Sequence, residues 1–173
     1  MAIRTRTYIA ADFDHDKDAV DILYKWKKDG RLDFDFNDAH ELTHAQDSSL
    51  PCSIKSSLKA RMDISKTFVL IVGNHTNSIT KGSCQYCTSY NSWTEACARD
   101  HFVDYRSYIE YECDKAVEAG ISIIVLYKST VVDRSKCPEA VRFKGLHVAM
   151  EYNSAGYLYW NYDAVKEAFD KVK

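Results

Sequence analysis

No long apolar run occurs in this chain, and no stretch approaches the roughly 18 residues that a membrane span requires. The first residues, MAIRTRTYIAADF, lack the apolar segment of a signal peptide. Basic clusters are absent as well, because 23 Lys and Arg stand against 25 Asp and Glu, for a net charge of −2. We therefore expect no membrane and no nucleic acid as partner, and we predict a cytoplasmic protein.

Glycine and proline are scarce, with 6 and 2 residues in a chain of 173. The glycines never form the G-x-G-x-x-G loop that binds dinucleotides, so a Rossmann dehydrogenase is disfavoured. The composition is otherwise typical of a globular protein, with 46% hydrophobic and 28% charged residues. At roughly 150 residues per domain, the length predicts one domain over residues 1–173.

Strand and helix patterns alternate along the chain. Short apolar or alternating runs predict five strands, near residues 8–11, 32–36, 68–72, 121–127 and 146–152. Apolar residues at helical spacing predict helices near residues 19–26, 54–65, 109–117 and 165–172. This order predicts an α/β fold with an open, doubly wound, mainly parallel five-stranded sheet and helices on both faces. Residues 80–104 break the pattern with a Cys/Tyr-rich run, which we interpret as an insertion.

In such a sheet, ligands bind beyond the carboxyl ends of the strands. Three polar loops follow predicted strands there, at residues 12–16, 38–49 and 73–76. The helix near residues 109–117 begins close by, and its Tyr108 and Glu112 fall on one stripe. A carboxylate flanked by aromatic rings at this edge can act on a sugar.

Four segments resemble the TIR-like domains of bacterial Thoeris anti-phage defence proteins. They are YIAAD (8–12), DFNDAH (35–40), VLIVGNHT (69–76) and YIEYECDKA (108–116), and the similarity runs in order over about residues 5–130. TIR enzymes carry a catalytic glutamate in a W-x-x-x-E-like helix motif, in which Tyr108 takes the aromatic position and Glu112 the glutamate position. The tyrosine and the insertion before this helix are departures from the family pattern.

The resemblance implies a flavodoxin-like (TIR) fold and cleavage of the nicotinamide–ribose bond of NAD, with Glu112 as the catalytic residue. The product would be an ADP-ribose-derived signal, cyclic or conjugated, that activates a separate effector. Self-association into dimers or filaments and activation by a phage component are implied as well. The residues implied to bind the nucleotide are Asp12, Phe13, Asp14, His15, Asp38, His40, Ser48, Thr76 and Tyr108.

Other interpretations remain open for these residues. The domain could be a non-catalytic TIR module for protein–protein interaction, in which Glu112 is incidental. It could also resemble a nucleoside deoxyribosyltransferase, because the same fold and a helix glutamate serve glycosidic exchange. Asp14 or Asp16 could simply cap the helix that follows.

The six cysteines predict reduced thiols or metal ligands rather than a disulfide framework. Cys84-x2-Cys87-x9-Cys97-x3-His101 has ligand types and spacing that suit a structural tetrahedral zinc site. Such a site would hold together an insertion without an apolar core. Free thiols packed around Tyr86, Tyr90 and Trp93 are the alternative.

Overall fold

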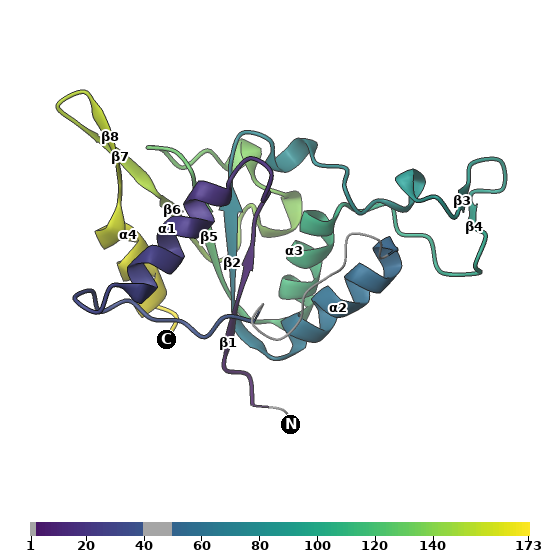
Figure 1. The fold of residues 1–173 in the computed structure, drawn as a ribbon, viewed down its shortest axis with the longest axis horizontal. Helices are drawn as coiled ribbons and strands as arrows, with labels where there is room; N and C mark the ends of the chain where they lie inside the picture. The colour runs from purple at the N-terminus through teal and green to yellow at the C-terminus, as the bar shows by residue number, and fades with distance from the viewer. Residues whose placement is uncertain (1–2, 40–49) are drawn as a thin grey trace.

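The computed structural model describes residues 3–39 and 50–173 of the chain (Figure 1). Its helices are α1 (Lys17–Lys28), α2 (Pro51–Asp63), α3 (Tyr108–Ala119) and α4 (Tyr162–Asp170). Its strands are β1 (Arg6–Ala10), β2 (Ser65–Val72), β3 (Tyr90–Asn91), β4 (Ala96–Cys97), β5 (Ser122–Tyr127), β6 (Leu146–Ala149), β7 (Glu151–Ser154) and β8 (Tyr157–Trp160). All four predicted helices are therefore present, with ends that shift by a few residues.

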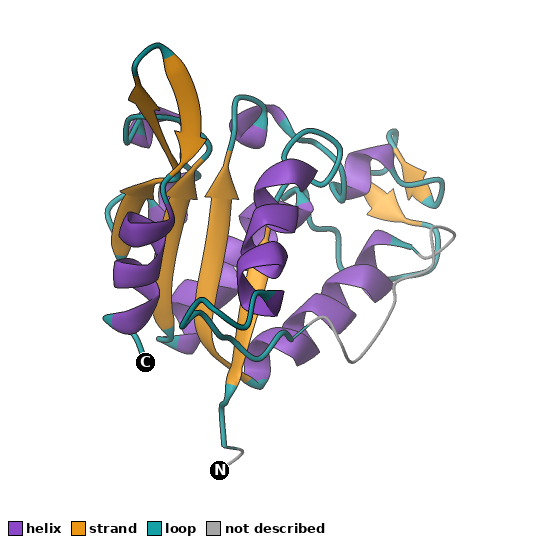
Figure 2. Ribbon diagram, turned by 60° about the vertical axis from the view of Figure 1, so that its left-hand side comes forward, coloured by secondary structure: helices purple, strands orange, loops and turns teal. Residues whose placement is uncertain are grey.

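One parallel sheet organises the fold, with the strand order β1-β2-β5-β6 (Figure 2). Its central strand β2 carries the run Phe68–Val72, in which no residue is more than 2% exposed. Both faces of the sheet are covered, by α1 and α4 on one side and by α2 and α3 on the other (Figure 1). The prediction of a doubly wound α/β fold is confirmed.

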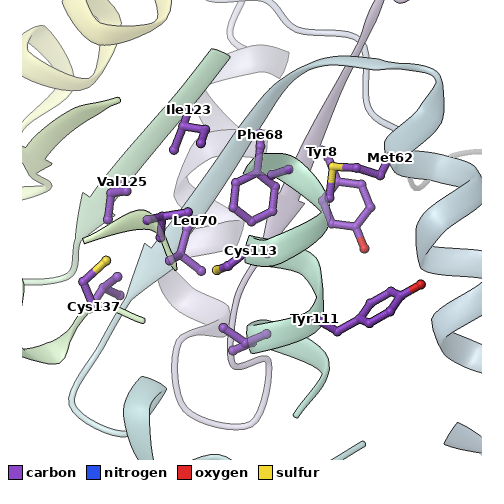
Figure 3. Packing of buried hydrophobic residues seen from close by; sticks show 14 of the residues in the cluster. Tyr8, Met62, Phe68, Leu70, Tyr111, Cys113, Ile123, Val125 and Cys137 are labelled. Atoms are coloured by element: carbon purple, nitrogen blue, oxygen red, sulfur yellow. The ribbon is translucent and has the colours of Figure 1, made fainter. Parts of the chain in front are cut away.

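The sheet separates two apolar layers. The layer under α2 and α3 contains Tyr8, Met62, Phe68 and Cys113, and Figure 3 shows these side chains packed between the sheet and α3. The layer under α1 and α4 is built around Leu23, Trp26 and Phe169 and their neighbours. Alternate residues of each buried strand supply the two layers, which is why these strands read as continuous apolar runs.

The strand predicted at residues 32–36 does not form, so the described sheet has four strands rather than five. Phe34 and Phe36 do point inward, and both pack against Phe169 of α4. Their alternation with aspartates therefore marks burial rather than strand pairing. The chain then touches the free edge of β1 in a single parallel bridge between Thr7 and Asp38, beside β1 as in a flavodoxin-like order.

The strand predicted at residues 146–152 is divided in two. β6 ends the parallel sheet, and β7 turns away to pair with the unpredicted β8 in an antiparallel hairpin. At the tip of this hairpin Ala155 and Gly156 both have positive φ, as a two-residue hairpin turn requires. Figure 1 shows this hairpin extending beyond the sheet.

Residues 80–104 lie at the opposite end of the molecule, around β3 and β4 (Figure 1). From residue 84 to residue 104, all of which the structure describes, no residue is buried. The segment therefore has no apolar core of its own. Among the described helices, none combines the length and apolar character needed to cross a membrane.

Candidate active site

Helix α3 begins and ends at strong local signals. Ser107 Oγ accepts the N–H of Glu110 at 3.2 Å, and Glu110 Oε2 accepts the N–H of Ser107 at 2.7 Å, which completes a capping box. Gly120 ends the helix with a left-handed φ of 62°. These caps fix which residues of α3 face α2 and the loop after β1.

A cavity of about 240 Å³ lies where α2, α3 and the carboxyl end of β1 meet. Its lining residues are Ala11, Asp12, Phe13, Asp14, Ile54, Leu58, Arg61, Ile79, Lys81, Tyr108, Ile109 and Glu112. A hollow of about 260 Å³ at the other edge of the sheet is lined by Thr5, Thr7 and Lys66, among others. Because ligands of parallel sheets bind at the carboxyl edge, the first cavity is the candidate site.

Glu112 is held inside this cavity by Tyr8 of β1. The Tyr8 hydroxyl donates to Glu112 Oε1 at 2.5 Å, and the two residues are 0% and 7% exposed. Burial raises the pKa of Tyr8 well above its ordinary value, and the negative charge and hydrogen bond of Glu112 raise it further. Tyr8 therefore stays protonated and donates to the carboxylate throughout the neutral pH range.

Two cations also line the cavity. Arg61 of α2 is 7% exposed and lies close enough for its charge to lower the pKa of Tyr8, against the larger effect of burial. Lys81 lies 3.9 Å from Asp14 in an exposed ion pair, which contributes little to stability. The cavity thus places carboxylates and cations around an apolar floor formed by Ile54, Leu58 and Ile109.

The loop after β1 is ordered by Asp12. One carboxylate oxygen of Asp12 accepts the N–H of Asp14 at 3.1 Å, and the other lies 2.6 Å from Nδ1 of His15. The side chain of Phe13 is 52% exposed at the cavity. Asp12, Phe13 and Asp14 therefore reach the cavity together with Tyr108 and Glu112, as the sequence predicted.

A family comparison covers the first part of this site. Residues 8–81 match the family described as Thoeris protein ThsB, TIR-like domain. Over these residues the chain is similar to a TIR-like domain of the Thoeris ThsB type. The matched segment contains Tyr8, the loop after β1 and Arg61, and it ends before α3, so Glu112 lies outside it. No curated protein matches the chain.

Several residues predicted for the TIR-like site lie elsewhere. His15 stacks on His75, with 4.2 Å between the ring centroids, and does not line the cavity. Thr76 is buried, and its Oγ1 accepts the N–H of Gly73 at 2.9 Å, which closes the loop after β2. Asp38 accepts a hydrogen bond from Tyr24 of α1, on the other face of the sheet. His40 and Ser48 lie outside the described residues.

Asp16 does not cap α1 through its side chain, although it occupies the N-cap position. Its carboxylate is instead buried against Gly73, where a Cβ would lie 2.2 Å from it, and it lies 3.6 Å from Lys128. Burial raises the pKa of Asp16, and the positive charge of Lys128 opposes that rise. The helix-capping interpretation is therefore wrong for Asp16, whose role is packing at the edge of β2.

The sequence analysis did not assign Tyr8, Arg61 or Lys81 to the candidate site. A signal existed for Arg61, since it follows Ile54 and Leu58 at the spacing of one helix face and so occupies a core-facing position. Lys81 lies near the start of the insertion, where no apolar periodicity indicates which way its side chain points. Tyr8 was assigned to a buried strand, but its partner is 104 residues away in the sequence.

Gly82 sets the position of the Tyr108 ring in the cavity wall. Its φ is +99°, and a Cβ on it would lie 2.5 Å from Cδ1 and 2.6 Å from Cγ of Tyr108. The backbone N–H of Tyr108 also donates to the carbonyl of Lys81 at 2.9 Å. The start of the insertion and the start of α3 are therefore packed as one unit.

Gly82→Ala is expected to lower the free energy of unfolding by about 2–3 kcal/mol. The new methyl group would displace the Tyr108 ring, and alanine would have to adopt an unfavourable positive φ. The matched control is Gly156→Ala, at a φ of +82° with open space around the new methyl group. That control is expected to lose about 1 kcal/mol. Urea unfolding of both variants measures the difference, and equal losses would show that the ring contact does not matter.

The residues predicted to bind zinc do gather in space. Cys84, Cys87, Cys97 and His101 all line one small cavity, and Cys52 of α2 joins them. As they stand, however, no three His, Cys, Asp or Glu side chains among the described residues are arranged to hold a metal ion. Trp93 is 96% and Tyr86 65% exposed, so these two rings do not pack over the thiols as the alternative interpretation required.

Proposed function

We propose that this protein is an NAD-cleaving TIR enzyme of anti-phage defence, with Glu112 as its catalytic carboxylate. The observation that carries the proposal is the buried Glu112 carboxylate, held by Tyr8 in a cavity at the carboxyl edge of the sheet. The match to the Thoeris ThsB family supports the defence role.

The chemistry suits a single carboxylate. When the bond between ribose C1′ and the pyridinium nitrogen breaks, its electron pair leaves with the nitrogen, and nicotinamide departs as a neutral molecule. No general acid is then needed, in contrast to the carboxylate pair of an ordinary glycosidase. Glu112 would stabilise the positive charge that develops on the ribose, and Tyr8 would keep the carboxylate oriented.

The other cavity residues suit the rest of the substrate. Phe13 and Tyr108 offer aromatic surfaces to the nicotinamide ring, and Arg61 and Lys81 offer positive charge to the diphosphate. A volume of about 240 Å³ is below the roughly 300–1,000 Å³ typical of small-molecule sites. We therefore propose that the cavity holds the nicotinamide riboside end and that self-association into dimers or filaments completes the site around the adenylate end.

The acceptor that attacks the ribose cation decides the product. Water gives ADP-ribose, whereas a group of the adenylate portion gives a cyclic product and another molecule gives a conjugate. We propose a cyclic or conjugated product that activates a separate effector, with a phage component as the trigger of assembly. The product acts as the signal in this proposal, so the effector need not touch the enzyme.

The test is chromatography of NAD incubated with concentrated purified protein, with and without lysate of phage-infected cells, and with Glu112→Gln as the control for contaminating enzymes. Nicotinamide release with an ADP-ribose-derived product is the expected result. Exchange of bases on free deoxynucleosides, with NAD untouched, would indicate the glycosyl-transfer alternative. Folded protein that turns over neither substrate under either condition would overturn the proposal in favour of an interaction module.

A further inference from the structure

Four cysteines and one histidine line a small cavity where the insertion meets α2. Cys52 comes from the first turn of α2, Cys84 and Cys87 from one turn of the insertion, and Cys97 from β4. Together with His101 they line a cavity of about 10 Å³, which is the space of one water-sized occupant. Only two further cysteines exist in the chain, and both are buried in the core.

Two nitrogen atoms lie close to sulfur atoms of this group of cysteines. The backbone N–H of Asp104 donates to Cys84 Sγ at 3.3 Å, and Nδ1 of His101 lies 3.1 Å from Cys52 Sγ. N–H groups directed at sulfur are the usual outer contacts of cysteine-bound metals, because they stabilise negative charge on the ligand.

The insertion also has no apolar core to hold its shape. No residue between 84 and 104 is buried, and the rings of Trp93 and Phe102 are 96% and 89% exposed. Small segments without an apolar core are commonly stabilised by a metal ion or by disulfides, and all six cysteines here are free. The thiols are therefore the groups best placed to supply the missing stability.

We propose that Cys52, Cys84, Cys87 and Cys97 bind one structural Zn²⁺ ion, and that His101 supports Cys52 from outside the ligand set. Tetrahedral Zn²⁺ commonly takes four thiolates in structural sites. Cys52 is assigned as the fourth ligand in place of His101 because it is half-buried on a rigid helix, whereas His101 is exposed. Binding forms four Zn–S bonds and releases the thiol protons to solvent.

Metal binding also involves a rearrangement, since the described thiols are not yet in ligating positions. Zn–S bonds of about 2.3 Å require the four sulfur atoms to close around the ion. Such sites rarely exist before the metal binds, so binding and local folding occur together. The zinc site would thus order the insertion rather than occupy a finished cage.

The site would tie the insertion to a wall of the candidate active site. Cys52 lies on α2, and further along the same helix Ile54 and Arg61 line the cavity that holds Glu112. Lys55 of α2 already contacts the chain where the insertion ends, donating to the carbonyls of Asp104 at 3.3 Å and Arg106 at 2.7 Å. Zinc would add a further and stronger connection between α2 and the insertion.

The test is the zinc content of the full-length protein after exposure to Zn²⁺ and removal of unbound metal, followed by competition with a chelator. One Zn²⁺ per chain is expected for the unmodified protein and for the control Cys137→Ser, whose thiol lies in the core. Cys52→Ser and Cys97→Ser are expected to bind at least about 100-fold more weakly, and His101→Ala about 10-fold more weakly. Cobalt bound in place of zinc reports thiolate ligation by its absorption, independently of enzymatic activity.

Two results would overturn the proposal. Folded protein that takes up no Zn²⁺ would show that the thiols are not a metal site. Full affinity in Cys52→Ser together with lost affinity in His101→Ala would show that His101, not Cys52, is the fourth ligand. Circular dichroism of each variant separates a lost ligand from a lost fold.

Discussion

Glu112→Gln is expected to lower the rate of nicotinamide release at least about 1,000-fold, because the amide carries no negative charge to oppose the ribose cation. The amide has the shape of the carboxyl group and can still accept the hydrogen bond of Tyr8, so the fold should survive. Initial rates of nicotinamide release at saturating NAD measure the loss in kcat. Thermal unfolding checks that the variant remains folded.

The matched control is Glu118→Gln on the same helix. Glu118 is exposed, pairs with Lys115 at 2.5 Å and does not line the cavity. Glu118→Gln removes the same charge from α3 but should leave the rate of nicotinamide release unchanged. Exposed ion pairs contribute little to stability, so the variant should also remain folded. Equal activity of Glu112→Gln and unmodified protein would remove Glu112 from the mechanism.

The fold was predictable where local signals and burial agree. The continuous apolar run Phe68–Val72 predicted a strand, which is the buried β2, and the apolar residues at helical spacing near 109–117 predicted α3. The strand predicted from the alternation at residues 32–36 was wrong. An alternating pattern indicates which side chains are buried, but it does not indicate whether a partner strand is present. Phe34 and Phe36 are instead buried against Phe169 of α4.

Within the candidate site, only the residues that carry the family resemblance could be predicted. Tyr108 and Glu112 share one helix stripe, and Asp12 follows the first strand, so the sequence could bring them to one edge of the sheet. The contacts of Tyr8 with Glu112 and of Cys52 with His101 join residues 104 and 49 positions apart. Such pairs depend on how α2 and α3 pack on the sheet, and no spacing rule in a single sequence contains that information.

Tyr8→Phe is expected to lower kcat for nicotinamide release by about 10- to 100-fold, which corresponds to the loss of one hydrogen bond to a charged group. KM should change little, because Tyr8 is not among the residues that line the cavity. Initial rates over a range of NAD concentrations measure kcat and KM separately.

Tyr127→Phe is the control for the loss of a buried phenol. Tyr127 is 1% exposed, lies in the same apolar layer, and its hydroxyl is 2.8 Å from Nδ1 of His147 rather than near Glu112. Both variants should lose about 1–3 kcal/mol of unfolding free energy at most, but only Tyr8→Phe should lower kcat. If Tyr8→Phe kept the wild-type kcat while Glu112→Gln was inactive, Tyr8 would be a packing residue, and the assignment of Glu112 would still stand.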